Sequence, residues 1–208
     1  MNKRQKKKQI KIKNKKLIEK YPFLLPRNVW TGKPLKGYNY MHTELDCMPE
    51  GWNKAFGEMM CEEIKEVLIE KNMLHEYRIS QVKEKYGSLR WYDFGHTEEI
   101  RDIIHKYEYL SEKTCVCCGK FDVSLFDSGW LSPYCDKCFL ESYKQRERNI
   151  AKYSKEELVL PSDEEILKEY RLEDEPLRYE LNIEIMSKEG CRHRKILLTD
   201  TINKLKKG

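Results

Sequence analysis

Apolar residues at helical spacing mark two segments in the first half of the chain. The first runs through residues 52–68 and predicts an amphipathic helix that begins after Pro49 and ends near Lys71. The second spans residues 100–110, and Thr97 stands where a helix N-cap is expected. Because stripes of this kind usually pack into a core, we expect both helices to bury their apolar faces.

Between these helices the pattern changes to the alternation that is typical of β-strands. Residues 77–83 and 89–94 predict two strands, and Tyr86-Gly87 supplies the turn between them. A helix, a hairpin and a second helix in this order predict a small α+β body over residues 17–112.

The strongest chemical signal is a set of cysteines in paired spacing. The pairs are Cys115/Cys118 and Cys135/Cys138, and sixteen residues separate them. This C-x2-C-x16-C-x2-C spacing is typical of a tetrahedral zinc site, and four thiolates leave the metal no open position for catalysis. We therefore predict one structural Zn²⁺. Cys117 is either a ligand in place of Cys115 or Cys118, or a spare thiol.

The residues around the cysteines predict a compact module over residues 113–153. Gly119 suits a tight turn after the first pair, and turn residues at 127–129 separate two short apolar segments. From Cys138 the chain continues without Gly or Pro until Pro161, which predicts a helix. A turn, a hairpin and a helix in this order are similar to a treble-clef zinc finger, and a zinc ribbon is the alternative.

The remaining residues, 154–208, predict an extension made of a helix, a strand and a second helix. Ser162 and Glu165 form a capping-box pattern at the start of the first helix. Residues 177–185 alternate strictly between apolar and polar, which predicts a strand that pairs with the hairpin or with a partner's sheet edge. The tail from Lys195 has the spacing of a short amphipathic helix.

The net charge of +5 is unevenly distributed along the chain. Residues 1–16 contain nine Lys or Arg and no acid, so the rest of the chain carries a net charge of −4. We predict a disordered basic arm, which either binds nucleic-acid phosphates without sequence preference or only solubilises the protein. No apolar run approaches the ~20 residues of a membrane span, and cysteine pairs of this type predict a reducing, cytoplasmic setting.

Several of these motifs occur together in an order that resembles a known family. They are Gly51-Trp52, the string Lys-Glu-Lys-Tyr-Gly-Ser-Leu-Arg at residues 83–90, and the two cysteine pairs. Over about residues 48–140 this arrangement resembles a family of small uncharacterised bacteriophage and prophage proteins. The resemblance implies a viral or bacterial cytoplasmic setting and a metal module, and it implies no reaction.

Basic residues of the hairpin and of the predicted finger helix are candidate nucleic-acid contacts. Cations beside aromatic rings can grip phosphates and stack bases, but the same residues can equally form a solvated edge over a core. The candidate residues are Lys83, Lys85, Arg90, Trp91, Lys144, Arg146 and Arg148.

The five histidines form no recognisable catalytic array, and phosphate-binding loops and nucleophile elbows are missing from the sequence. We therefore predict a non-enzymatic, zinc-binding accessory protein of the phage type, which associates with nucleic acid through residues 1–16 and the 77–94 hairpin. The alternative is a protein-interaction module that modulates or antagonises host machinery. It would use the 177–185 strand or the zinc finger as its contact.

Overall fold

The computed structural model describes residues 2–28, 30–154, 157–172 and 201–207. These residues combine helices with two small antiparallel sheets, so the predicted α+β class is confirmed. The helices are α1 (Lys3–Lys20), α2 (Glu50–Trp52), α3 (Glu58–Glu70), α4 (Glu98–Ser111), α5 (Asp136–Ser154) and α6 (Asp163–Tyr170), with short helical turns η1 (Pro22–Leu24), η2 (Glu44–Cys47) and η3 (Asn53–Gly57). The strands are β1 (Arg78–Lys85), β2 (Ser88–Phe94), β3 (Ser124–Asp127) and β4 (Leu131–Tyr134).

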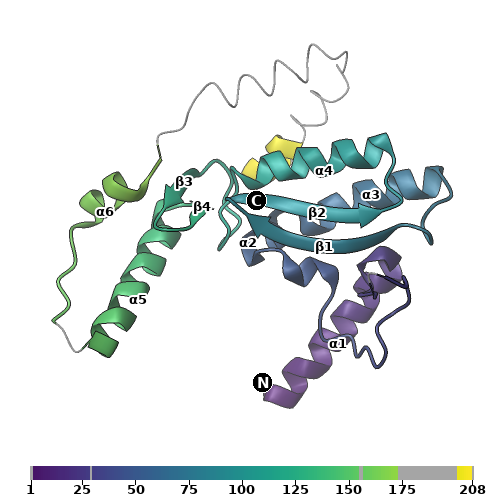
Figure 1. Ribbon diagram of the computed structural model, residues 1–208, viewed down its shortest axis with the longest axis horizontal. Coiled ribbons are helices and arrows are strands. Elements are labelled where there is room, and N and C mark those ends of the chain that lie inside the picture. The colour runs from purple at the N-terminus through teal and green to yellow at the C-terminus, as the bar shows by residue number, and fades with distance from the viewer. Residues whose placement is uncertain (1, 29, 155–156, 173–200, 208) are drawn as a thin grey trace, which may run out of the picture.

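The body of the protein is built on the β1–β2 hairpin, as the alternating pattern predicts. Lys83 pairs with Arg90, and the turn residues Tyr86 and Gly87 both have positive φ, 55° and 75°. A two-residue turn of this kind matches the twist of the flanking strands. Helix α4 lies along β2 and packs on α3 (Figure 1), so the apolar sides of the two helices and the hairpin enclose one core. Its largest fully buried side chains include Trp52, Tyr77, Tyr107, Phe23, Phe56, Met60, Ile64 and Leu68.

The helix predicted from Pro49 to Lys71 is present but interrupted. It consists of α2, the π-helical turn η3 and α3. The Nδ2 atom of Asn53 donates a hydrogen bond to the carbonyl of Leu45, 3.0 Å away. The apolar residues keep a spacing of three and four through this turn, so their pattern predicts one unbroken helix.

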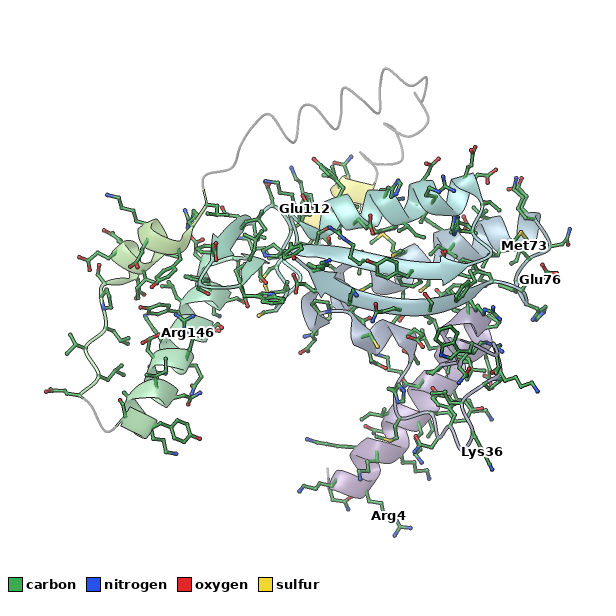
Figure 2. The ribbon with its side chains drawn as sticks, in the orientation of Figure 1. Arg4, Lys36, Met73, Glu76, Glu112 and Arg146 are labelled. Carbon is green, nitrogen blue, oxygen red and sulfur yellow. The ribbon has the colours of Figure 1, made fainter. Side chains whose placement is uncertain are left out.

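Helix α1 corrects the prediction of a disordered arm over residues 1–16. Asn2 caps it in a capping box with Gln5, and no Gly or Pro interrupts the helix. Its last turns attach to the body: Leu17 packs on the core, and Asn14, which is buried, donates to the carbonyl of Tyr40. The other end projects away from the body, with Arg4 near its tip (Figures 1 and 2). The packing of its C-terminal turns on the body thus stabilises α1 as a whole, including the basic residues near its N-terminus.

A second, smaller core lies in the cysteine module. Phe126 of β3 stacks on Phe139 of α5, with ring centroids 4.1 Å apart, and Ile166 of α6 completes the cluster. Helix α6 begins at the predicted cap Ser162, but it does not form a separate extension. The backbone N–H of Leu172 donates to Leu125 at 2.9 Å, which joins the chain after α6 to β3.

The C-terminal residues 201–207 form a helical segment, in agreement with the predicted amphipathic tail. Leu205 is buried in the core of the body, and Thr201 is buried beside Lys106 of α4, 3.4 Å from its ammonium group. The predicted strand at 177–185 lies outside the described residues.

Candidate metal centre

Cys115 and Cys118 lie in a tight turn that follows helix α4. The N–H of Cys115 donates to the carbonyl of Lys120 at 2.9 Å, and the N–H of Gly119 donates back to Cys115 at 3.0 Å. Gly119 adopts φ +83°, a conformation that side chains other than Gly rarely accept. This turn holds two sulfur atoms on one side of the backbone, as the C-x2-C-Gly spacing predicts.

The second pair lies at the junction of β4 and α5. Cys135 immediately precedes the helix, and its carbonyl accepts the N–H of Phe139 at 3.0 Å. Cys138 therefore lies in the first turn of α5, close to the positive end of the helix dipole. The helix dipole there would stabilise the negative charge of a metal-bound thiolate.

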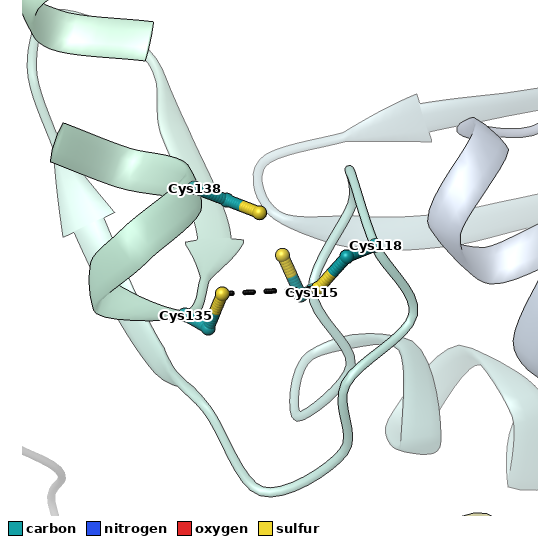
Figure 3. A group of neighbouring side chains, drawn as sticks. All are labelled: Cys115, Cys118, Cys135 and Cys138. Carbon is teal, nitrogen blue, oxygen red and sulfur yellow. Dashed lines mark hydrogen bonds between the residues drawn. The ribbon is translucent and has the colours of Figure 1, made fainter. Parts of the chain in front are cut away.

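The four sulfur atoms converge on one point (Figure 3). All lie within 4.8 Å of one another, and the Sγ atoms of Cys118 and Cys135 are 3.7 Å apart. A Zn–S bond of about 2.3 Å places tetrahedral sulfurs about 3.8 Å apart. The cluster formed by Cys115, Cys118, Cys135 and Cys138 can thus hold a metal ion, and its size fits zinc.

Local electrostatics give this cluster an affinity for a cation. The pKa of Cys115 is lowered to about 4, first by a hydrogen bond from the Cys117 thiol and then by backbone N–H groups directed at its sulfur. Burial raises the pKa of Cys135 and of Cys138. Several thiolates can therefore coexist here only if a positive ion compensates their charge. A zinc ion would supply that charge, and it would be held by all four sulfurs in a closed structural shell.

Cys117 is exposed and does not belong to the four-sulfur cluster. Its thiol instead donates a hydrogen bond to Cys115, and this bond raises the pKa of Cys117. Of the alternatives that the sequence leaves open, the geometry favours a spare thiol beside the site.

The turn that carries Cys115 is packed directly on helix α2. A Cβ atom added to Gly51 would lie 2.1 Å from the carbonyl oxygen of Cys115, so only Gly fits. Gly51 also donates its N–H to Val116 at 2.8 Å, and the indole Nε1 of Trp52 donates to Thr114 at 2.7 Å. The apolar pattern predicts Trp52 as a core residue but gives no role to Gly51. The one local sign of its role is that a Gly stands inside a helical pattern. Since Gly destabilises a helix, its presence there indicates a packing reason.

A second contact joins the two hairpins. Glu84 of β1 accepts hydrogen bonds from the N–H of Gly87 at 2.6 Å and from the indole of Trp130 at 2.9 Å. Gly87 lies against Leu125, whose Cδ2 atom would be 3.0 Å from an added Cβ. The Lys-Glu-Lys-Tyr-Gly-Ser-Leu-Arg motif at residues 83–90 therefore contacts the cysteine module through Glu84 and the turn at Gly87.

No protein-family model, curated protein or solved structure matches this chain. Within the described residues, no helix is both long and apolar enough to traverse a bilayer.

The predicted basic surface of the hairpin is only partly formed. Lys83 and Arg90 are cross-strand neighbours, and the Lys83 ammonium lies 5.3 Å from the ring centroid of Tyr92. Lys85, which is exposed, lies over the ring of Tyr86. Arg90 donates to Ser88 Oγ and to the Leu89 carbonyl, which ties part of its guanidinium to the fold.

Trp91 corrects one member of the predicted nucleic-acid set. It is only 4% exposed, and its indole N–H donates to the hydroxyl of Tyr77 at 3.0 Å. Because side chains alternate along a strand, Trp91 points into the core with Leu89, while Tyr92 points outward. The outward ring next to Trp91 is therefore Tyr92, which is 44% exposed.

The three candidate cations of α5 do not form one surface. Lys144 pairs with Asp163 of α6 at 2.5 Å, and Arg146 donates to the carbonyl of Ser128 at 3.1 Å. Only Arg148 remains an exposed side chain with no partner among the described contacts. These pairings arise from the packing of α6 and of the β3–β4 turn, neither of which the charge pattern of α5 reveals.

Proposed function

We propose that this chain is a zinc-binding accessory protein, of the phage type that its hairpin and cysteine motifs resemble, and that it associates with nucleic acid in the cytoplasm. Its cysteine module is similar to a treble-clef finger. The order of metal turn, β3–β4 hairpin and α5 supports this comparison, because α5 contributes the fourth ligand from its first turn. The zinc ion stabilises the module and takes no part in chemistry.

Helix α1 is the observation that carries the nucleic-acid proposal. Residues 3–20 contain ten Lys or Arg and one Glu, and the basic side chains before Asn14 are exposed. Like charges three and four residues apart repel one another on a helix. A polyanion relieves this repulsion and releases its own counterions when it binds, so α1 favours a phosphate backbone over other partners.

The test is a truncation that leaves the attachment of α1 intact. Deleting residues 1–12 removes six cations and no acid, and it changes the formal net charge from +5 to −1. We expect affinity for nucleic acid at low salt to collapse. The slope of log affinity against log salt should fall by about 0.9 for each lost duplex phosphate contact and by about 0.7 for single strands.

A charge-matched pair of variants separates this role from net charge alone. Lys6, Lys7 and Lys8 are changed to Gln in the first variant. In the control, three exposed lysines elsewhere are changed to Gln: Lys152, Lys168 and Lys206. The proposal requires the first variant to lose much more affinity than the control. Equal losses would show that net charge, and not helix α1, governs binding.

The alternative, a protein-interaction module, is supported by the far end of α5. Ile150 is 51% exposed and Tyr153 is 86% exposed there. An apolar interface of this kind should be insensitive to salt, whereas phosphate binding weakens steeply. Binding of a protein partner that survives high salt and is lost in Tyr153→Ser would favour this second function.

A further inference from the structure

A hydrogen-bonded turn near the start of β1 carries the most exposed large apolar side chain among the described residues. Trp30 is 92% exposed. The turn below it is closed by Asn28, whose N–H donates to Lys33 at 2.8 Å and whose carbonyl accepts the N–H of Gly32 at 2.8 Å. The side-chain oxygen of Asn28 also accepts the N–H groups of Trp30 and Thr31. These hydrogen bonds fix the backbone N–H of Trp30 in the turn, while its side chain is exposed.

Two arginines meet at the same turn. Arg27 donates from Nη1 to the carbonyl of Gly32 at 3.1 Å. The Nη1 atom of Arg78 lies so close to Gly32 that an added Cβ would be 1.9 Å from it. Neither guanidinium forms an ion pair within the part of the chain that the structure describes.

Arg78 also has a side-chain donor that is not hydrogen-bonded within the described residues. Its guanidinium lies over the ring of Phe94, 4.8 Å from the centroid, and its Nε is buried without a hydrogen-bond acceptor. A buried, unsatisfied donor costs free energy, and two cations that share one turn repel each other. An anion at this turn would relieve the repulsion between the two arginines, and a phosphate matches the planar guanidinium fork.

We propose that Arg27, Arg78 and Trp30 form a binding site for single-stranded nucleic acid, in which the arginines hold a phosphate and Trp30 stacks on an unpaired base. This inference deepens the proposed function, because it names the form of nucleic acid that the protein prefers. An indole stacks on any base whose face is free, and the bases of an intact duplex offer no such face to a protruding side chain. The exposed Lys33 adds a further cation to the same turn.

The experiment compares one labelled oligonucleotide as a single strand and as a duplex, with binding measured by fluorescence anisotropy at low salt. Trp30→Ala should weaken single-strand binding by about tenfold or more, as expected for the loss of one stacked base, and should leave duplex binding unchanged. Tyr153→Ala is the matched control, since Tyr153 is also an exposed ring. It should change neither affinity.

Two further measurements test the individual contacts. In a Trp130→Phe background, Trp30 is the only indole that is not buried, so its fluorescence should be quenched when the single strand binds. Arg27→Gln and Arg78→Gln should each lower the salt slope by about 0.7 on single strands. The control Lys168→Gln, an exposed cation of α6, should not.

The outcomes separate this proposal from the proposed function. If changing Lys6, Lys7 and Lys8 to Gln abolishes nucleic-acid binding while Trp30→Ala binds single strands normally, the Trp30 site is overturned. The proposed association with nucleic acid then still stands. Equal weakening of single strands and duplex by Trp30→Ala would also overturn the single-strand assignment. If the native protein binds neither form at low salt, both proposals fail.

Discussion

The indole of Trp52 donates a hydrogen bond to the carbonyl oxygen of Thr114 at 2.7 Å, and both residues are fully buried. Thr114 immediately precedes the first metal ligand, Cys115. A side chain of the first core helix therefore fixes the backbone on which the metal turn begins.

Replacing Trp52 by Phe should destabilise the protein and loosen the metal turn. The change leaves a buried carbonyl without its donor, which costs about 1–3 kcal/mol, and removes buried volume as well. Urea unfolding monitored by circular dichroism should show the loss. Trp130→Phe is the control, because that indole is largely exposed, and it should change stability much less. Equal stability of the two variants would contradict the role assigned to Trp52.

A methyl group at Gly51 should weaken metal binding without touching a ligand. It would meet the carbonyl of Cys115 at 2.1 Å, so the metal turn must shift. We expect Gly51→Ala to lower zinc affinity about 10- to 100-fold, as changes around metal ligands do. Competition with a chromophoric chelator measures this. The control is Gly129→Ala in the same module, where an added Cβ meets nothing within 4 Å although φ is +90°; it should retain its metal.

The purified protein should contain one zinc ion per chain. Cys138→Ser removes one of four ligands, and because site assembly is coupled to folding, the variant should lose zinc and the structure of its module. Cys47→Ser and Cys117→Ser replace exposed thiols outside the cluster and should keep one zinc each. Elemental analysis with circular dichroism distinguishes these results. A folded, metal-free wild type would contradict the assignment.

The attachment of α1 should depend on pH through Glu62. Hydrogen bonds from Lys20 and Tyr21 lower the pKa of Glu62 from 4.5 to about 2. A lowered carboxylate pKa stabilises the folded state above the unfolded value, and that contribution is lost as the pH falls from about 4.5 towards 2.

Glu62→Gln should therefore flatten the acid limb of the stability curve over this range. Glu70→Gln, an exposed change on the same helix, is the control. Since acid also releases zinc from both variants, the difference between their curves isolates the Glu62 contribution. Identical acid limbs would show that the carboxylate does not stabilise the attachment of α1.

Local patterns were sufficient to predict most of the regular structure. Apolar spacing located α3 and α4, and the Tyr86-Gly87 turn located the hairpin. Paired spacing identified all four cysteines of the cluster. The two sulfurs within each C-x2-C pair approach one another through local geometry alone.

Features that depend on long-range packing were not predictable in this way. The helical form of α1 depends on the docking of Leu17, which contacts elements far along the chain. The basic neighbours of Trp91 suggest a surface contact, whereas the packing of α4 on the hairpin buries its ring. Lys144 is neutralised by Asp163 only because α6 folds back on α5. The cationic turn at Gly32 depends on Arg78, which the sequence places 46 positions away.

The contact between Trp52 and Thr114 also sets an order of events during synthesis. The two residues are 62 positions apart, and the last ligand, Cys138, follows later still. Chains begin to fold from the N-terminus as they emerge from the ribosome, so the surface around Gly51 and Trp52 is made before any sulfur that it will support. Metal capture then follows once Cys138 has been made. A shortage of zinc in the cell should therefore leave new chains with this apolar surface uncovered, which marks them for chaperones and proteases.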